Sequence, residues 1–246
     1  MDAKPYLRQI ALRPERVEHP ERYPFSIPAI RDMGMVTFHV DVTFLIGENG
    51  AGKSTLMEAI AVACGLNPEG GSKNFRFSTR PEESELGRNL RIVRSFRRPR
   101  DSYFLRAESY FNVATEIERL DAGEAYGGLS LHEQSHGEAF MSLVNNRFRG
   151  DGLYILDEPE AALSPTRQLA MLRRIHQLVQ MKSQFIIATH SPILLGYPDC
   201  AILQLDDKGI TPIAYEDIGH VTLTRRFMND RAGMLRDLFA DDDPID

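Results

Sequence analysis

The sequence of 246 residues is poor in cysteine and has neither a long apolar run nor an excess of positive charge. Cys64 and Cys200 stand alone without metal-ligand spacing, which argues against a disulfide scaffold or a zinc site and fits a reducing compartment. No apolar run approaches the length that spans a bilayer, and the first residues, MDAKPYLRQI, lack the apolar core of a secretory signal. We therefore expect a cytoplasmic chain that does not itself insert into a membrane.

Acidic residues outnumber basic ones: the chain has 35 aspartates and glutamates and 29 lysines and arginines, which gives a net charge of -6. This balance argues against a generally basic coat for nucleic acid. The segment GRNLRIVRSFRRPRD is a local exception, with six arginines between Arg88 and Arg100. It indicates either a solvated strand face and turn or a contact surface for nucleic acid or an acidic partner. No heptad pattern runs between residues 60 and 150, so long coiled-coil arms are not expected.

The composition, 42% hydrophobic and 26% charged, is that of an ordinary globular chain. Strand-like apolar runs alternate with helical segments, which predicts an α/β fold with a mainly parallel sheet flanked by helices. We predict a single domain over residues 1–240, with an inserted and partly helical lobe at roughly 68–150. The acidic residues 241–246 are expected to form a solvated tail.

Individual elements follow from periodicity and from turn residues. The expected strands are residues 6–13, 42–46, 153–156 and 184–189, and a two-stranded hairpin over 201–215. Helices are expected after the 42–46 strand, over 166–181 and near 221–239. The helix at 166–181 places five apolar residues on one face, which predicts packing against a sheet. These are Leu169, Leu172, Ile175, Leu178 and Val179.

The segment GENGAGKST, from Gly47 to Thr55, satisfies the pattern G-x-x-x-x-G-K-[ST] directly after the apolar run VTFLI. Its glycines leave room for backbone N–H groups to point at phosphate oxygens. Lys53 is then placed to reach the β- and γ-phosphates, and Ser54 to ligate Mg2+. The sequence therefore predicts a nucleoside triphosphate site, with the positive end of the next helix facing the phosphates.

Two adjacent carboxylates follow a second buried strand in LYILDEPE. Asp157, at the strand end, is placed to hold Mg2+ directly or through water. Glu158 can point toward the γ-phosphate and polarise an attacking water as a general base. The pair favours hydrolysis over binding alone.

The segments LHEQSHGEAF and ATHSP are less specific when each is taken alone. Ser135 to Glu138 precede a helical run, so the Ser135 hydroxyl and the helix N-terminus could bind an anion, or Ser135 could simply cap the helix. His190, at the end of the 184–189 strand, is equally consistent with structural capping and with chemistry.

Taken in order, the P-loop, SHGE, LDEP, ALSP and THS resemble the motif series of ABC-type ATPases over most of residues 36–215. The chain is nearer to the soluble SMC/RecF-like group of predicted AAA family ATPases than to transporter subunits, which usually carry L-S-G-G-Q. This resemblance implies a P-loop NTPase fold with an ABC-type head, that is, the parallel sheet plus an antiparallel β part and a small helical lobe. It also implies ATP and Mg2+ as cofactors.

The resemblance assigns roles residue by residue. Glu158 would be the hydrolytic base, His190 the switch histidine that senses the γ-phosphate, and Asp157 the Walker B carboxylate. Ser135, Gly137 and Glu138 would contact ATP bound to the opposite protomer, and Ala162, Leu163 and Ser164 would form the D-loop at the dimer seam. The Walker A residues would be Gly47, Asn49, Gly50, Ala51, Gly52, Lys53, Ser54 and Thr55.

Two family features have no clear match. Glu108 stands where the glutamine of the glutamine loop is expected, and the aromatic residue that stacks on adenine is unassigned. Phe25 or Arg31 could serve, although packing and a solvated charge are the simpler interpretations of these two.

The resulting expectation is a soluble ATPase that pairs head to head when it binds ATP and acts on nucleic acid or a partner protein, as in DNA repair or defence. One alternative is the ATPase subunit of a membrane ABC transporter. Another is a nucleotide-dependent switch with little turnover.

Overall fold

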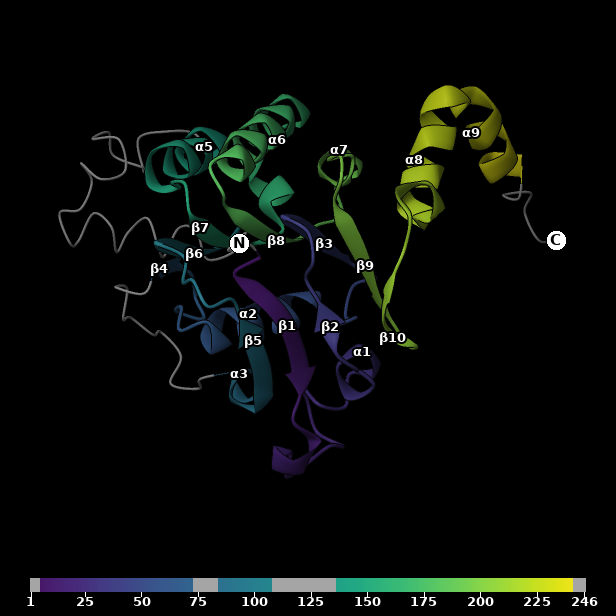
Figure 1. The fold of residues 1–246 in the computed structure, drawn as a ribbon. Coiled ribbons are helices and arrows are strands. Elements are labelled where there is room, and N and C mark those ends of the chain that lie inside the picture. The colour runs from purple at the N-terminus through teal and green to yellow at the C-terminus, as the bar shows by residue number, and fades with distance from the viewer. Residues whose placement is uncertain (1–4, 73–83, 108–135, 241–246) are drawn as a thin grey trace. The chain divides into compact units, whose positions relative to one another are not determined.

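The computed structural model describes residues 5–72, 84–107 and 136–240 of the chain (Figure 1). Contacts between Cα atoms divide the chain into two compact units, Met1–Pro212 and Ile213–Asp246. The prediction of one domain over residues 1–240 stays a prediction.

The first unit is built on a seven-stranded sheet in the order β10-β9-β3-β8-β7-β6-β4. Strands β9, β3, β8, β7 and β6 run parallel, while β10 and β4 pair antiparallel at the two edges. Every residue of β3, β7 and β8 is buried, as expected for parallel strands covered on both faces. In chain order the strands are β3 (Val42–Ile46), β4 (Gly71–Ser72), β6 (Asp101–Arg106), β7 (Gly152–Asp157), β8 (Gln184–Ala188), β9 (Ala201–Asp206) and β10 (Gly209–Pro212).

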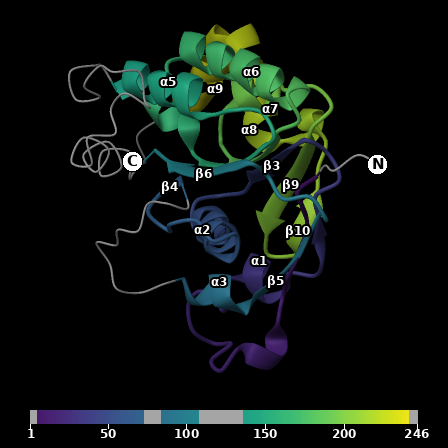
Figure 2. The same cartoon turned by 60° about the vertical axis from the view of Figure 1, so that its left-hand side comes forward.

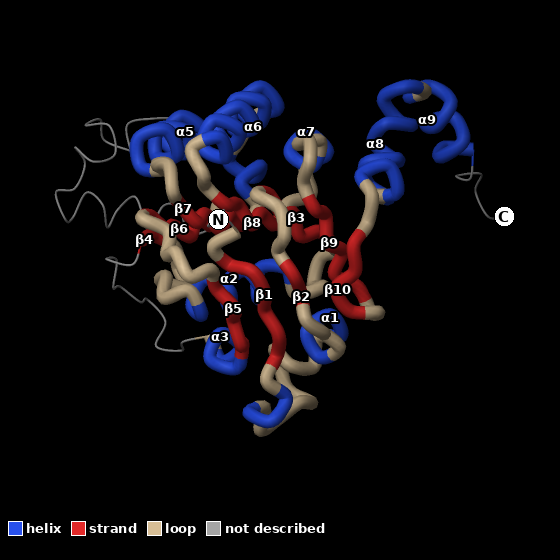
Figure 3. The backbone as a smooth tube through the Cα atoms, in the orientation of Figure 1, coloured by secondary structure: helices blue, strands red, loops and turns tan. Residues whose placement is uncertain are grey.

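A second sheet of three antiparallel strands has the order β2-β1-β5 and appears among the red segments of Figure 3. Its strands are β1 (Leu7–Leu12), β2 (Val36–Thr37) and β5 (Leu90–Arg94). Its presence agrees with the expected antiparallel β part of the fold. The strand and hairpin predictions at 6–13 and 201–215 correspond to β1 and to the β9–β10 pair.

Helix α2 (Lys53–Ala63) lies on one face of the large sheet, while α5 (His136–Arg147) and α6 (Pro165–Gln180) lie on the other (Figure 2). Leu56, Met57 and Ile60 of α2 share one hydrophobic core with Ile10 of β1 and Ile155 of β7. The P-loop helix is therefore held between the two sheets. The shorter helices of this unit are η1 (Pro14–Arg16), α1 (Pro28–Arg31), α3 (Glu85–Asn89), η3 (Pro159–Ala162) and α7 (Pro192–Leu195).

The buried face of α6 differs in part from the predicted one. Gln168, Met171, Ile175 and Leu178 are its buried residues, whereas Leu169 is 59% exposed. Leu169 follows Gln168 directly, and one residue turns a helix by about 100°, which carries its side chain off the face centred on Met171 and Ile175. The prediction placed Leu169 on the buried face because it considered only apolar residues, whereas the buried face includes Gln168.

Strands β4, β5 and β6 all fall within the segment 68–150, for which an inserted lobe was predicted. They pair in the two core sheets, which that prediction did not anticipate. Residues 73–83 and 108–135 lie outside the described residues, and a helical lobe there stays a prediction.

The second unit contains η4 (Tyr215–Asp217), α8 (Gly219–Asn229) and α9 (Arg231–Ala240). A single closing helix near 221–239 was therefore wrong. Asp230 leaves helical geometry with φ -138° and ψ 60°, and its carboxylate accepts a hydrogen bond from the Gly233 N–H at 3.0 Å. Aspartate favours such local bonding over helix continuation. Across the described ranges, no helix has the length and apolarity to cross a membrane.

Candidate functional site

The P-loop, residues 47–55, connects β3 to α2 and passes very close to neighbouring backbone and side chains. A Cβ atom on Gly47 would lie 2.5 Å from the carbonyl oxygen of Leu205. Gly52 has φ 93°, and a Cβ there would lie 3.0 Å from Ile27 Cγ2. These positions therefore require glycine, as the sequence predicts for a loop whose backbone encloses phosphate. Asn49 and Gly50 are exposed, and Ala51 is partly buried.

Lys53 begins α2 and is only 5% exposed. Its ammonium group donates hydrogen bonds to the carbonyl oxygens of Gly47 at 2.8 Å and Glu48 at 3.1 Å. Burial lowers the pKa of Lys53, and the carboxylates of Glu158 and Asp157 act in the opposite direction. The cation thus lies inside the loop, next to the acidic strand end.

Asp157 ends β7 with a side chain that is 5% exposed, and its two oxygens have different neighbours. Oδ1 accepts a hydrogen bond from the Ser54 hydroxyl at 3.2 Å, whereas Oδ2 lies 3.4 Å from Arg106 Nε. Arg106 Nη1 is in turn 3.2 Å from Glu58 Oε2 of α2. Hydroxyl and carboxylate oxygens are the hard donors that Mg2+ prefers, so Ser54 and Asp157 fit this ion.

Arg106 was not predicted from the sequence. It directly opposes Asp157 in the β6–β7 register, and that pairing cannot be read from a chain position some fifty residues earlier. An arginine at the end of a strand-like run, SYFLR, is the only signal the sequence offers.

Glu158 and His190 follow the adjacent parallel strands β7 and β8, so their side chains emerge at the same edge of the sheet as the P-loop. Glu158 Oε1 lies 3.9 Å from His190 Nε2, and each side chain is 37% exposed. Glu158 has the left-handed backbone conformation, φ 50° and ψ 51°, which is unusual for a residue other than glycine, asparagine or aspartate. Its N–H donates to the Ala188 carbonyl at 2.9 Å, which fixes this turn against β8.

Gly137 and Glu138, which belong to the SHGE segment that the resemblance assigns to the ABC signature motif, lie at the start of α5. Gly137 is packed so tightly that a Cβ there would be 2.5 Å from Arg167 Nη1 and 2.9 Å from the Ala162 carbonyl oxygen. Glu138 is ion-paired to Arg167, with 3.0 Å between Oε1 and Nη2. Ser135 lies outside the described residues. The described signature residues therefore adjoin the predicted D-loop of the same chain.

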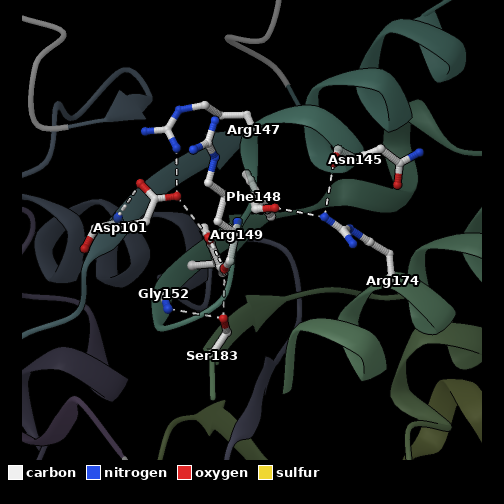
Figure 4. Close-up of polar contacts among 10 residues, drawn as sticks. Asp101, Asn145, Arg147, Phe148, Arg149, Gly152, Arg174 and Ser183 are labelled. Atoms are coloured by element: carbon white, nitrogen blue, oxygen red, sulfur yellow. Dashed lines mark hydrogen bonds and ion pairs between the residues drawn. The ribbon is translucent and has the colours of Figure 1, made fainter. Parts of the chain in front are cut away.

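The other end of α5 is anchored by polar contacts at the amino ends of β6, β7 and β8 (Figure 4). Arg147 Nη1 donates to Asp101 Oδ2 at 2.7 Å, and the Ser183 hydroxyl donates to the Arg149 carbonyl at 3.0 Å. Arg174 of α6 donates to the Phe148 carbonyl at 2.9 Å, at the carboxyl end of α5. A cation there also interacts favourably with the helix dipole. These contacts hold α5 and α6 in a defined register.

Of the two residues suggested for adenine stacking, only Phe25 is too buried to stack on a base, and the suggestion for Arg31 stays a prediction. Phe25 is 2% exposed within the hydrophobic core, and Arg31 is paired with its neighbour Asp32, 2.7 Å away. Tyr23 is instead 70% exposed, and its hydroxyl lies 2.9 Å from Thr55 Oγ1. It sits among closely spaced prolines, and only the folded chain brings it to the P-loop helix. Glu108 lies outside the described residues.

The arginine-rich segment forms β5 and the turn that leads into β6. Six cationic residues there and in two neighbouring loops are called the basic surface below: Arg94, Arg97, Arg98, Arg100, Arg149 and Lys182. Asp151 lies among them, 3.5 Å from Arg97 Nη2 and 4.0 Å from Arg100 Nε. Phe96, in the same turn, is 75% exposed. The turn leads into the amino end of β6, opposite the carboxyl strand ends that carry Glu158 and His190.

The chain is similar to known proteins in both sequence and structure. A family model described as an AAA domain matches residues 30–147. The phosphonates import ATP-binding protein PhnC 2 of Albidiferax ferrireducens is 26% identical over 280 aligned positions, covering 97% of this chain and 96% of that protein. The ribose import ATP-binding protein RbsA of Yersinia pestis is 28% identical over 231 positions, which cover 85% of this chain but only 39% of RbsA.

Solved structures show a weaker likeness. The SMC head domain from Thermotoga maritima aligns with a TM-score of 0.46 and 14% identity, covering 85% of this chain and 98% of that one. The structure of cbiO1 from Clostridium perfringens, part of an ABC transporter complex, also aligns with a TM-score of 0.46, at 16% identity and with coverage of 85% and 92%.

The P-loop with its buried lysine, the parallel sheet and the near full-length match to an ATP-binding protein agree on one assignment. These findings support an ABC-type P-loop ATPase.

Proposed function

We propose that this ATPase works by ATP-driven pairing of two chains, each of which supplies one half of every hydrolytic site. The observation that carries the proposal is the convergence of Lys53, Ser54, Asp157, Glu158 and His190 at one edge of the sheet. Lys53 would neutralise the β- and γ-phosphates from within the loop. Ser54 and Asp157 would hold Mg2+, which, when bound, neutralises charge that develops on the phosphates.

Glu158 is the proposed general base. Its carboxylate would accept a proton from water as the water oxygen adds to the γ-phosphorus and the bond to the β–γ bridging oxygen breaks, leaving ADP and phosphate. His190, 3.9 Å from Glu158, is the proposed contact to the γ-phosphate. The Glu158 side chain is partly exposed, which leaves its carboxylate accessible to a nucleotide at this edge.

Ser135, Gly137 and Glu138 are the proposed second half of the site. The tight packing of Gly137 against Ala162 supports this, because it joins the signature to the predicted D-loop as one surface. A second chain that presents this surface would close over the first chain's nucleotide, so that ATP binding stabilises the dimer by mass action.

Steady-state ATP hydrolysis of the wild type, Lys53→Ala and Glu158→Gln tests the assignment of the residues. Loss of a charge-stabilising or proton-accepting group should lower kcat by about 100-fold or more. Equal rates in all three would refute the residue roles and favour the nucleotide-dependent switch. Light scattering adds a second test, since Glu158→Gln should accumulate as a dimer with saturating ATP and Mg2+.

For the cellular role, we favour action on nucleic acid, and the basic surface is the observation that supports it. Its six cations stand out on a chain with a net charge of -6, and an exposed phenylalanine lies among them. Cations that contact phosphates, with aromatic rings that stack on bases, are a common means of binding single strands. ATP hydrolysis measured with and without single-stranded DNA should show stimulation at low salt that declines steeply as salt rises. Absence of stimulation at every salt concentration would favour a protein partner.

The alternative role is that of a transporter's ATPase subunit. It is supported by PhnC 2, RbsA and the other curated relatives, whose names are those of import ATP-binding proteins. Affinity purification of the chain from solubilised membranes would distinguish the two roles, because a transport subunit should retain a membrane-spanning partner at fixed stoichiometry.

A further inference from the structure

Two loops at the proposed catalytic edge are joined by side chains that have no role in the chemistry described above. The β7–α6 loop, residues 158–164, begins with Glu158 and continues through η3. The β8–α7 loop, residues 189–191, contains His190. Glu160 of the first loop accepts a hydrogen bond on Oε1 from the backbone N–H of His190 at 2.6 Å. The position of His190 therefore depends on a carboxylate from the neighbouring loop.

Gln168 of α6 forms a second link between the same loops. Its Nε2 donates to the Leu163 carbonyl at 3.0 Å, and its Oε1 accepts from the Ser191 hydroxyl at 2.5 Å. Ser191 also caps α7 by accepting from the N–H groups of Ile193 and Leu194. The Gln168 amide thus bonds to the β7–α6 loop through its nitrogen and to the β8–α7 loop through its oxygen.

Burial makes these links restrictive. Gln168 is 9% exposed and Ser191 is 6% exposed, so water does not readily replace a broken bond. If one loop moved without the other, a buried donor or acceptor would lose its partner, which is unfavourable. The β7–α6 loop also has an outward side, since Ala161 and Ser164 are exposed.

We propose that Glu160 and Gln168 are positioning residues that make the two loops move as one body. If a second chain displaced the exposed part of the β7–α6 loop, the relative position of the Glu158 and His190 side chains would then change. These side chains belong to the two loops and lie 3.9 Å apart. This inference rests on the proposed function, in which a second chain docks at Ala162 to Ser164. Pairing of two chains would therefore change the position of Glu158, the proposed base, through these side-chain hydrogen bonds.

Hydrogen exchange of the full chain without nucleotide tests the mechanical link alone. Glu160→Ala and Gln168→Leu should each accelerate amide exchange by about tenfold or more in both loops, because each loop would lose a bond that holds it to the other. The matched controls are Glu18→Ala and Gln177→Leu, which alter exposed residues of the same types, the second on the same helix. Faster exchange confined to one of the two loops would overturn the proposal.

A double-mutant cycle measured by ATP hydrolysis tests the consequence for catalysis. Glu160→Ala should lower kcat while KM for ATP changes by less than about threefold, and Glu160→Gln, which keeps Oε1 as an acceptor, should retain most activity. Added to His190→Ala, the Glu160→Ala change should cause no further loss, because both act through His190. Losses that multiply in the double variant would indicate a general structural effect and would overturn the positioning role.

The two measurements fail separately. If the wild type showed no ATP-dependent pairing, the proposed function would fall, while the exchange data would still decide whether the loops are linked. If pairing and hydrolysis occurred but the loops exchanged independently, only the present inference would fall. Melting temperatures of all variants identify any that fail to fold, and Glu160→Gln then carries the comparison.

Discussion

The Tyr23 ring lies exposed next to the first turn of the P-loop helix, with its hydroxyl 2.9 Å from Thr55 Oγ1. An exposed ring at the rim of a nucleotide site can stack on a base, and such stacking contributes about 1–3 kcal/mol. We therefore predict that Tyr23→Ala raises the Kd for the nucleotide by about tenfold, while Tyr23→Phe, which keeps the ring, stays within about threefold. Titration of both variants with a fluorescent ATP analogue measures this. Equal losses in the two variants would assign the effect to the hydroxyl and exclude stacking.

Tyr6 links β1 to the basic surface, since its hydroxyl donates to the Lys182 carbonyl at 3.0 Å and lies 3.3 Å from Asp151 Oδ1. Burial, together with the nearby Asp151 carboxylate, raises the pKa of Tyr6 from 10.0 to about 12. A group whose pKa is raised on folding contributes stability that is complete below its unfolded pKa and is lost as pH rises through its folded pKa.

The stability advantage of the wild type over Tyr6→Phe should therefore be constant below pH 10 and decline between pH 10 and about 12. Urea unfolding of both proteins across this range provides the measurement. A stability difference that does not change with pH would show that folding does not raise the pKa of Tyr6.

Among the elements, α6 shows how a correct helix prediction can misplace a face. Met171 is fully buried and Ile175 is 1% exposed, whereas Leu169 is largely exposed. We predict that Ile175→Ala lowers the free energy of unfolding by about 2–5 kcal/mol through loss of buried contacts and formation of a cavity. Leu169→Glu should change it by less than about 0.5 kcal/mol. Urea denaturation compares the two. A large loss from Leu169→Glu would mean that this leucine is covered in solution, for example by a second chain.

The elements that the sequence predicted well are those whose burial is local and complete. VTFLI and QFIIA are uniformly apolar, so their strands and the loops after them could be placed without knowledge of the rest of the chain. The convergence of Lys53 and Glu158 followed because parallel strands end at the same edge. Contacts of Arg106, Glu160 and Gln168 could not be predicted, since polar pairs between distant segments leave no periodic signal. The break at Asp230 was missed because helical periodicity continues on both sides of it.

At the scale of the whole first unit, the carboxyl ends and the amino ends of the parallel strands carry different chemical groups. These two sides of the sheet are called its carboxyl edge and its amino edge. The carboxyl edge carries the P-loop and the acidic strand end, and the amino edge carries the basic surface. The β6 and β7 strands run from one edge to the other, from Asp101 to Arg106 and from Gly152 to Asp157. A polyanion on the basic surface would therefore leave the nucleotide edge free for a second chain.

If two chains share each hydrolytic site, as proposed, two inactive variants should restore activity when they are mixed. Lys53→Ala disables the P-loop half, and Ser135→Arg is expected to disable the signature half, so each variant alone should be inactive. In a mixed dimer, however, the intact P-loop of one chain faces the intact signature of the other. Since half of the dimers in an equal mixture are mixed and each has one working site, activity should return to about a quarter of the wild-type rate. A mixture as inactive as its components would show that each chain completes its own site.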